Sequence, residues 1–255
     1  MKASAAIARY SLLEAWRTRV AWLVLGALAA AWLAAEFAAS LALTASASYR
    51  STVYAGLARL LLVFIVMLFV TSGVARAFAD RLHDLYWSRP LSRSAWFLGR
   101  LLGAATLALI GAALACLPLL AMAPLSAVST WGLSFAAELV IVAAASLTAI
   151  VALSQVMPAL LATTAFYFLS RAMAAIVLMS AGPAVDPDLW STRWIARAVE
   201  TIALALPALD RYARTQWLHA AGDGQMPLAP VLVEAAVYVV LLAAVGLFDL
   251  QRRED

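Results

Sequence analysis

Five charged side chains lie within stretches of sequence that are otherwise almost wholly apolar: Glu36, Arg59, Glu138, Arg171 and Glu234. A charge in hydrocarbon is costly, so such residues usually face the interior of a helix bundle or a polar cavity. Arg59 and Glu234 fall near the ends of their apolar runs, where a side chain can instead reach the headgroup layer. For Arg171, an ion pair with one of the glutamates is the alternative to a transport role. These charges predict a translocation path or a set of intramembrane ion pairs.

Catalytic chemistry is not predicted for this chain. Nucleotide hydrolysis needs a glycine-rich loop that ends in Lys and Ser or Thr, and the only lysine is Lys2. The two histidines, His83 and His219, are predicted on opposite sides of the membrane, and the only cysteine, Cys116, lies in an apolar run. We therefore expect neither a metal site nor a bound cofactor. Any ATP and Mg²⁺ would be bound by a separate ATPase.

Long apolar segments position these charges. Of the 255 residues, 65% are hydrophobic and 13% are charged, and the mean hydropathy is +0.92. Six runs reach the length of about 20 residues that a spanning helix needs; they lie near 20–43, 54–75, 98–122, 133–154, 157–181 and 229–249. They leave no room for a soluble catalytic domain. We expect an all-α polytopic membrane protein with six transmembrane helices, in which residues 1–255 form a single transmembrane domain.

Basic residues outside the runs predict the orientation. Arg9, Arg17 and Arg19 precede the first run, which is too long for a cleaved signal peptide, and the positive-inside rule places them in the cytoplasm. An even number of spans returns Arg252 and Arg253 to the same side. The sequence thus predicts a bacterial cytoplasmic membrane protein with both termini inside. Because the basic residues border the spans and form no continuous basic face, we expect contacts with lipid headgroups and none with nucleic acid.

Two segments outside the runs have their own predicted structure. Apolar residues recur at helical spacing in residues 1–19, which favours an amphipathic helix at the membrane surface; they are Ile7, Tyr10, Leu13 and Trp16. Residues 182–228 are punctuated by proline and glycine, and they contain an apolar-rich stretch that is too short and too charged to span comfortably. This pattern predicts an external helical cap or a re-entrant element.

The loop 76–97, predicted in the cytoplasm, is the part of the chain densest in charge. Arg76, Asp80 and Asp84 follow one another at i, i+4 spacing, which supports a short helix. Pro90 ends that helix, and Ser92 is a suitable N-cap for the next. Such a helix, held just below the membrane, could bind a groove of a cytosolic partner. A solvated loop is the alternative.

Short motifs in this loop and near the C-terminus resemble a known family. They are SRPLSR at 88–93, FLGR at 97–100, ALPALDRY at 205–212 and the tail FDLQRRED at 248–255. With these motifs the chain resembles the membrane subunit of ABC-2-type transporters, including the permeases related to that of the nitrous oxide reductase maturation exporter. The chain departs from many relatives at 78–87, where they carry a Gly/Glu-rich stretch and it has FADRLHDLYW.

The resemblance implies specific partners. Residues 80–87 would be the coupling helix that docks on the ATPase, with contacts from Asp80, Arg81, His83, Asp84, Leu85, Tyr86, Trp87 and Arg89. Two ATPase copies would bind ATP and Mg²⁺, and a second permease, identical or paralogous, would pair with this chain around a central path. A periplasmic accessory protein is a further candidate partner.

The resulting prediction is a permease that converts ATP-driven closure of two ATPases into movement of its spans. A secondary transporter that couples its intramembrane charges to an ion gradient is one alternative. A membrane scaffold that transports nothing is another. A lipid-like or amphiphilic cargo would suit the apolar interior, but the sequence does not identify the substrate.

Overall fold

The computed structural model describes residues 2–42, 46–79, 92–180, 190–219 and 228–252. All regular structure in these residues is helical. Six helices are long and apolar enough to cross a membrane, which makes this a multi-pass membrane protein as the sequence predicts. They are α2 (Val20–Leu41), α3 (Ser46–Ala79), α5 (Arg93–Leu119), α6 (Leu125–Leu153), α7 (Val156–Ser180) and α9 (Leu228–Arg252).

Several helices extend beyond the apolar runs that predict them. α3 begins at Ser46 rather than near 54, and α6 begins at Leu125 rather than near 133. In α3 the added turns are polar, and the hydroxyls of Ser51 and Thr52 donate to carbonyls of their own helix. Hydropathy detects the apolar part of a helix and not its polar end. Ser92 is the N-cap of α5, as predicted, since its Oγ accepts a hydrogen bond from Ala95 N.

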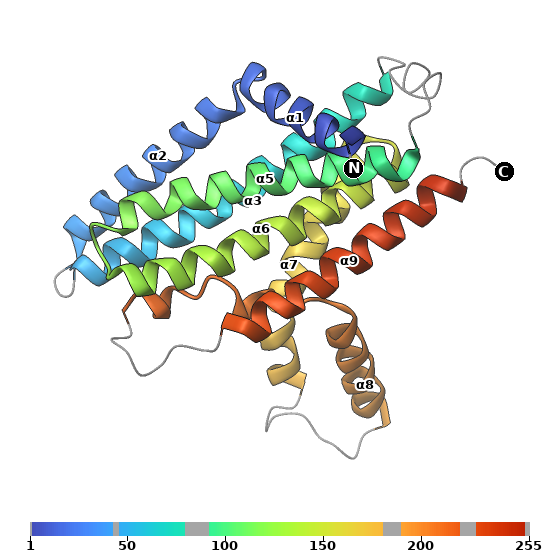
Figure 1. The fold of residues 1–255 in the computed structure, drawn as a ribbon. Coiled ribbons are helices and arrows are strands. Elements are labelled where there is room, and N and C mark those ends of the chain that lie inside the picture. Colours follow the sequence, from blue (N-terminus) through green and yellow to red (C-terminus); the bar gives the residue numbers. More distant parts are fainter. Residues whose placement is uncertain (1, 43–45, 80–91, 181–189, 220–227, 253–255) are drawn as a thin grey trace.

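The bundle has two distinct ends. The first turn of α1 (Lys2–Arg17) and the last turn of α9 lie at one end, which we call the terminal end (Figure 1). There Arg93 at the start of α5 donates to Leu250 O of α9 at 3.1 Å. The opposite, distal end holds the end of α2, the start of α3 and the start of α9. Helix α3 ends and α5 begins at the terminal end.

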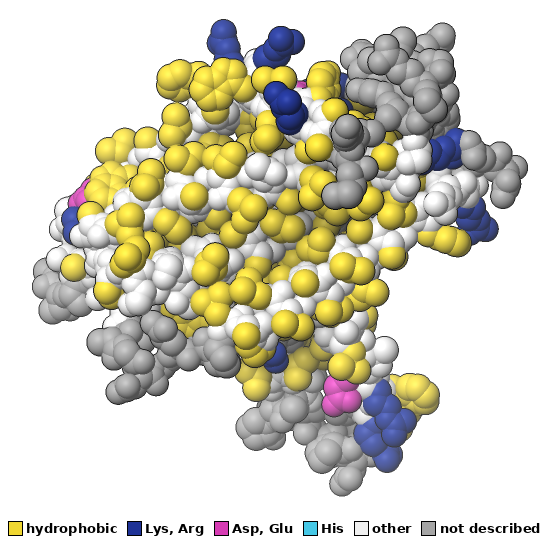
Figure 2. All heavy atoms as spheres, viewed as in Figure 1, with side chains coloured by type: hydrophobic (Ala, Val, Ile, Leu, Met, Phe, Trp, Pro, Cys, Tyr) yellow, Lys and Arg dark blue, Asp and Glu magenta, His cyan; other side chains and the backbone are white. Residues whose placement is uncertain are grey.

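Helix α6 forms the centre of the bundle. It packs against α3, α5, α7 and α9, and its fully buried side chains include Trp131, Phe135, Leu139, Ile141 and Leu147. The outer helices instead expose leucines, valines and phenylalanines along their length. Figure 2 shows these apolar side chains over the bundle, with charged side chains near its ends and on α8 (Trp190–Ala205). This pattern fits a bundle surrounded by lipid rather than by water.

Helix α1 packs tightly on α5 through two glycines. A Cβ atom at Gly99 would lie 2.7 Å from Ile7 Cβ, and one at Gly103 would lie 2.6 Å from Ser11 Cβ. Such close approach is the usual role of small residues at a helix–helix interface in a membrane. The predicted N-terminal helix is therefore present. Its Leu13 and Trp16 side chains are exposed, whereas Tyr10 is half-exposed and its ring lies under the Arg100 guanidinium of α5. Whether this exposed face lies on the membrane surface stays a prediction.

The segment predicted as an external cap has two unlike parts. α8 contacts α7 but leaves most of its side chains exposed, so it does not cover the bundle. Residues 207–218 instead lie across the distal end, with one 3₁₀ turn at Leu209–Arg211 and another at Thr215–Leu218. These turns contact α3, α6 and α7. The 207–218 segment thus lies against the bundle and α8 does not, while the choice between an external cap and a re-entrant element stays a prediction.

Candidate functional site

Glu138 on α6 is the centre of a buried polar network. Its side chain is fully buried, and its Oε1 accepts hydrogen bonds from Arg171 Nη1 and from the Tyr167 hydroxyl, each at 3.1 Å. Tyr167 and Arg171 lie four residues apart on α7, so one face of that helix presents both donors. The pair therefore joins α6 to α7 inside the membrane region.

Two arginines of the network also bind the 207–218 segment. Arg171 Nη1 donates to Leu209 O at 2.9 Å, and Arg59 Nη1 of α3 donates to Ala213 O at 2.8 Å. Arg59 and Arg171 both lie close enough to Glu138 to interact with its charge. The 207–218 segment is thus bound by arginines of α3 and α7, and the arginine of α7 is paired with Glu138 of α6.

Ala213 is held in a conformation that L-residues seldom adopt. Its φ is 46°, in the left-handed region. Its carbonyl accepts from Arg59 and from Trp131 Nε1, and its N–H donates to Ser134 Oγ at 3.0 Å. Strained backbone of this kind costs about 1–3 kcal/mol and persists only where its surroundings hold it in place. The network therefore fixes the shape of the 207–218 segment as well as its position.

The other side of the segment is attached to α9. Glu234 Oε1 accepts from Ala208 N at 2.9 Å, and the Tyr212 hydroxyl donates to Val231 O at 2.9 Å. Burial raises the pKa of the Tyr212 phenol above its ordinary value, and the nearby Glu234 carboxylate adds to the effect. Tyr212 therefore keeps its proton and its role as a donor.

One oxygen of the central carboxylate is not accounted for within the described residues. The hydrogen bonds of Arg171 and Tyr167 both go to Glu138 Oε1. Glu138 Oε2 is buried without a hydrogen-bond partner among the residues that the structure describes. Burying a carboxylate oxygen without a hydrogen-bond partner destabilises the folded protein, because the lost hydration is not replaced. A purely structural role for Glu138 does not explain why this destabilisation is tolerated.

The structure brings together four of the five intramembrane charges singled out from the sequence. Glu138, Arg171, Arg59 and Glu234 all lie in or beside this network, whereas Glu36 is separate and pairs with Arg50 at 3.1 Å near the α2–α3 connection. Arg171 pairs with Glu138, and a transport role for this pair stays a prediction. Arg59 binds a protein carbonyl rather than extending to the headgroups. The predicted ATPase contacts from Asp80 to Arg89 lie outside the described residues.

Sequence reasoning missed a second ion cluster at the terminal end. Glu14 of α1 accepts from Arg100 Nη1 at 2.6 Å and from Arg76 Nη2 at 3.4 Å. It therefore joins α1 to α5 and α3. Its position in the leader before the first span gave no sign of burial. The i, i+4 spacing of Tyr167 and Arg171 was a usable signal for the first network that was likewise missed.

The described ranges contain no candidate metal site. No group of three or more potential ligands among His, Cys, Asp and Glu is present there. His219 Nε2 instead contacts the hydroxyls of Ser51 and Thr52, at 3.3 and 3.0 Å.

No protein-family model matches the chain, and no curated protein matches it. Its function must therefore be argued from its own residues.

Proposed function

We propose that this chain is the permease subunit of an ATP-driven exporter of the ABC-2 type. The observation that carries most weight is the buried Glu138–Arg171 pair, which ties two spans to the 207–218 segment at the distal end. Ionisable groups at such depth usually mark a path for ions or substrate. In this proposal the terminal end is cytoplasmic and the membrane is the bacterial inner membrane.

ATP hydrolysis in this proposal belongs to another polypeptide. The lone lysine at position 2 excludes a phosphate-binding loop of the usual type in this sequence. Helix α3 ends and α5 begins at the terminal end, and in this proposal an ATPase docks there. The ATPase would bind ATP and Mg²⁺, and a second permease would complete the path.

Helix α3 offers a direct mechanical link between the two ends. It is one continuous helix from Ser46 to Ala79. Arg76, near its terminal end, contacts Glu14, and Arg59, about 25 Å away at 1.5 Å per residue, holds Ala213 O. A displacement of the 80–91 connection would therefore reach the distal network through a rigid element, and it would strain the bonds that hold the 207–218 segment.

The decisive experiment co-expresses the chain with a candidate ABC-type ATPase from the same genome. We would measure complex formation and ATP hydrolysis in proteoliposomes for the unmodified chain, for Asp84→Arg and Leu85→Arg, and for a control, Thr201→Arg on exposed α8. The docking proposal expects both changes at 84 and 85 to abolish stimulated hydrolysis while the control retains it. Unchanged binding and hydrolysis in all four proteins would refute the coupling role.

A secondary transporter is a second candidate, favoured by the unpartnered Oε2 of Glu138. A buried carboxylate beside an arginine and a tyrosine is an arrangement that can exchange an ion. Transport by the purified chain alone, driven by a proton gradient and lost in Glu138→Gln, would support this candidate against the exporter. An ATPase complex that forms but shows no substrate-dependent turnover would indicate a scaffold instead.

A further inference from the structure

A narrow groove runs along α3 from the terminal end toward the middle of the bundle. Its volume is about 170 Å³, and the α3 residues that line it range from Ile65 to Arg76. At 1.5 Å per residue this stretch of helix is about 16 Å long, half the thickness of a bilayer's hydrocarbon core. The groove thus lies between α3 and the start of α2, within one leaflet.

The lining of this groove changes character along its length. Ile65, Leu68 and Phe69 of α3, with Leu23 of α2, form an apolar wall. Ser72, Thr18 and Arg76 line the part nearest the terminal end. A groove that is apolar over most of its length and carries a cation at one end matches an amphiphile with a negative headgroup.

Among the residues that the structure describes, Arg76 has only a long ion pair, to Glu14 at 3.4 Å. Glu14 is shared between two arginines, and the shorter bond goes to Arg100, at 2.6 Å against 3.4 Å for Arg76. The Arg100 side chain is 7% exposed, whereas that of Arg76 is 51% exposed. Arg100 therefore takes most of the carboxylate, and the Arg76 guanidinium remains open to the groove mouth.

The turn between α1 and α2 adds further positive charge at the same place. Thr18, which lines the groove, stands between Arg17 and Arg19, and both arginines are exposed. Trp16 and Trp22 flank this turn with exposed fractions of 76% and 72%. Large exposed indoles are typical of the headgroup level of a membrane, so the basic cluster sits at the depth of lipid phosphates.

We propose that this groove binds one anionic phospholipid, with its phosphate at Arg76 and one acyl chain along the Ile65–Phe69 face of α3. Basic pockets between transmembrane helices are a known mode of recognition for anionic headgroups. The volume is below the roughly 300–1,000 Å³ of a drug-sized ligand pocket, so the groove holds a single chain while the rest of the lipid stays in the bilayer. The proposal depends on the membrane location and not on the transport function.

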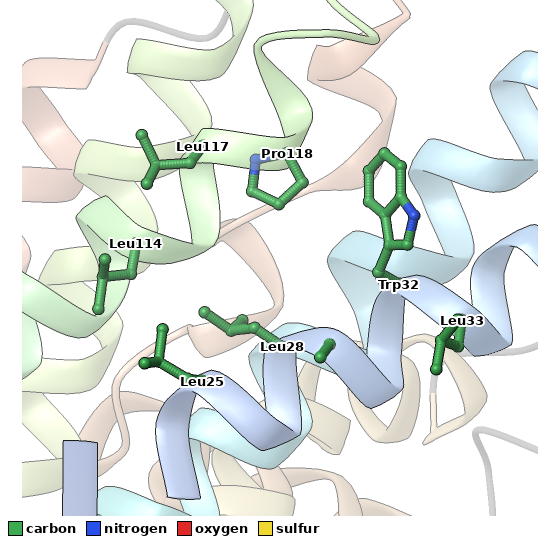
Figure 3. Close-up of a pocket in the computed structure, with 8 residues that line it drawn as sticks. Leu25, Leu28, Trp32, Leu33, Leu114, Leu117 and Pro118 are labelled. Atoms are coloured by element: carbon green, nitrogen blue, oxygen red, sulfur yellow. The ribbon is translucent and has the colours of Figure 1, made fainter. Parts of the chain in front are cut away.

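A larger groove between α2 and α5 serves as a contrast. It has a volume of about 550 Å³ and is lined by apolar residues that include Trp32, Leu114 and Pro118 (Figure 3). It has no cation at either end. Any lipid chain in it would be bound without regard to the headgroup, so this groove would not contribute to headgroup selectivity.

The test measures lipids retained by the purified full chain in native mass spectrometry. The protein is offered an equimolar mixture of phosphatidylglycerol and phosphatidylcholine with matched acyl chains. We expect the unmodified chain to prefer phosphatidylglycerol. Arg76→Gln should reduce this preference about fivefold, the effect of one basic residue near a membrane surface. Arg197→Gln on exposed α8 is the charge-matched control and should keep the preference.

A second variant tests the acyl-chain part of the site. Leu68→Trp keeps Arg76 in place but fills the groove, and it should reduce retention of phosphatidylglycerol, while glycerol phosphate without acyl chains should not compete. The proposal is overturned by equal losses in Arg76→Gln and Arg197→Gln, which would indicate diffuse charge, or by unchanged retention in Leu68→Trp. It is also overturned if the unmodified chain shows no preference.

Discussion

Arg171 Nη1 lies 3.1 Å from Glu138 Oε1, yet the two partners are unequally buried: the Glu138 side chain is inaccessible, whereas 25% of the Arg171 side chain is exposed. The carboxylate therefore depends on the arginine more than the arginine depends on the carboxylate. Arg171 also has Leu209 O as a second acceptor. Because of this asymmetry, loss of Arg171 and loss of Glu138 should lower the free energy of unfolding by different amounts.

Replacing Arg171 alone should lower the free energy of unfolding more than replacing both Arg171 and Glu138. Arg171→Gln leaves a charged carboxylate buried beside Tyr167, and breaking a buried pair in this way costs about 3–5 kcal/mol. Glu138→Gln in the same chain removes the stranded charge and should recover part of the loss. Unfolding in detergent micelles, compared across the two single variants and the double variant, measures this coupling. Additive losses would show that the two residues act independently.

Ser134 should control the local stability of the 207–218 segment. Its Oγ accepts from Ala213 N, and Ser134→Ala would leave that buried N–H unpaired at a cost of about 1–3 kcal/mol. Hydrogen exchange should become faster within the segment and stay unchanged in α3. Ser129→Ala is the matched control, because the exposed Ser129 hydroxyl bonds only to Ser126 O of its own helix. Equal exchange rates in both variants would contradict the assignment.

The sequence predicted the spans well because they depend on local composition. It predicted the N-cap at Ser92 for the same reason, since a cap is set by neighbours in the chain. The predicted start of α3 was too late, because the first turns of this helix are polar and a search for apolar runs does not detect them. Ser51 and Thr52 fit in these turns because their hydroxyls donate to carbonyls of the same helix. The sequence could not assign Glu138 to Arg171 or Glu14 to Arg100, because those pairings depend on which helices pack together.

Two glycines of α5 should be intolerant of a methyl group. In Gly99→Ala the new Cβ would lie 2.7 Å from Ile7 Cβ and 2.9 Å from the backbone oxygen of Ser4, so α1 must move away. We expect lower thermal stability and faster proteolysis of α1. Gly26→Ala on α2 is the control, since nothing lies within 4 Å of its added Cβ. There alanine should be neutral or stabilising by up to about 1 kcal/mol, through helix propensity. A stable Gly99→Ala with protected α1 would contradict the close packing.

Two glutamates, Glu14 of α1 and Glu36 of α2, show how burial decides what a salt bridge contributes to stability. Glu14 and Arg100 are 13% and 7% exposed, whereas Glu36 and Arg50 are 40% and 34% exposed. Glu14→Gln strands Arg100 and also frees Arg76, so it should cost about 3–5 kcal/mol and detach α1 from the bundle. Glu36→Gln removes a pair of the same chemistry that water can replace, and it should cost about 0–1 kcal/mol.

The same two variants also test whether Glu14 anchors α1 to the bundle. We would measure thermal unfolding in detergent and cross-linking of α1 to α5 for both variants, at low and at high salt. High salt should reduce the stability difference between the unmodified chain and Glu36→Gln, because salt screens an exposed ion pair. The stability difference for Glu14→Gln should stay nearly constant, because its ion pair is buried. If the two glutamine variants lose equal stability, or if α1 remains fixed to α5 in Glu14→Gln, then Glu14 does not anchor α1. In that case the glycine contacts at Gly99 and Gly103 alone would hold the helix on the bundle.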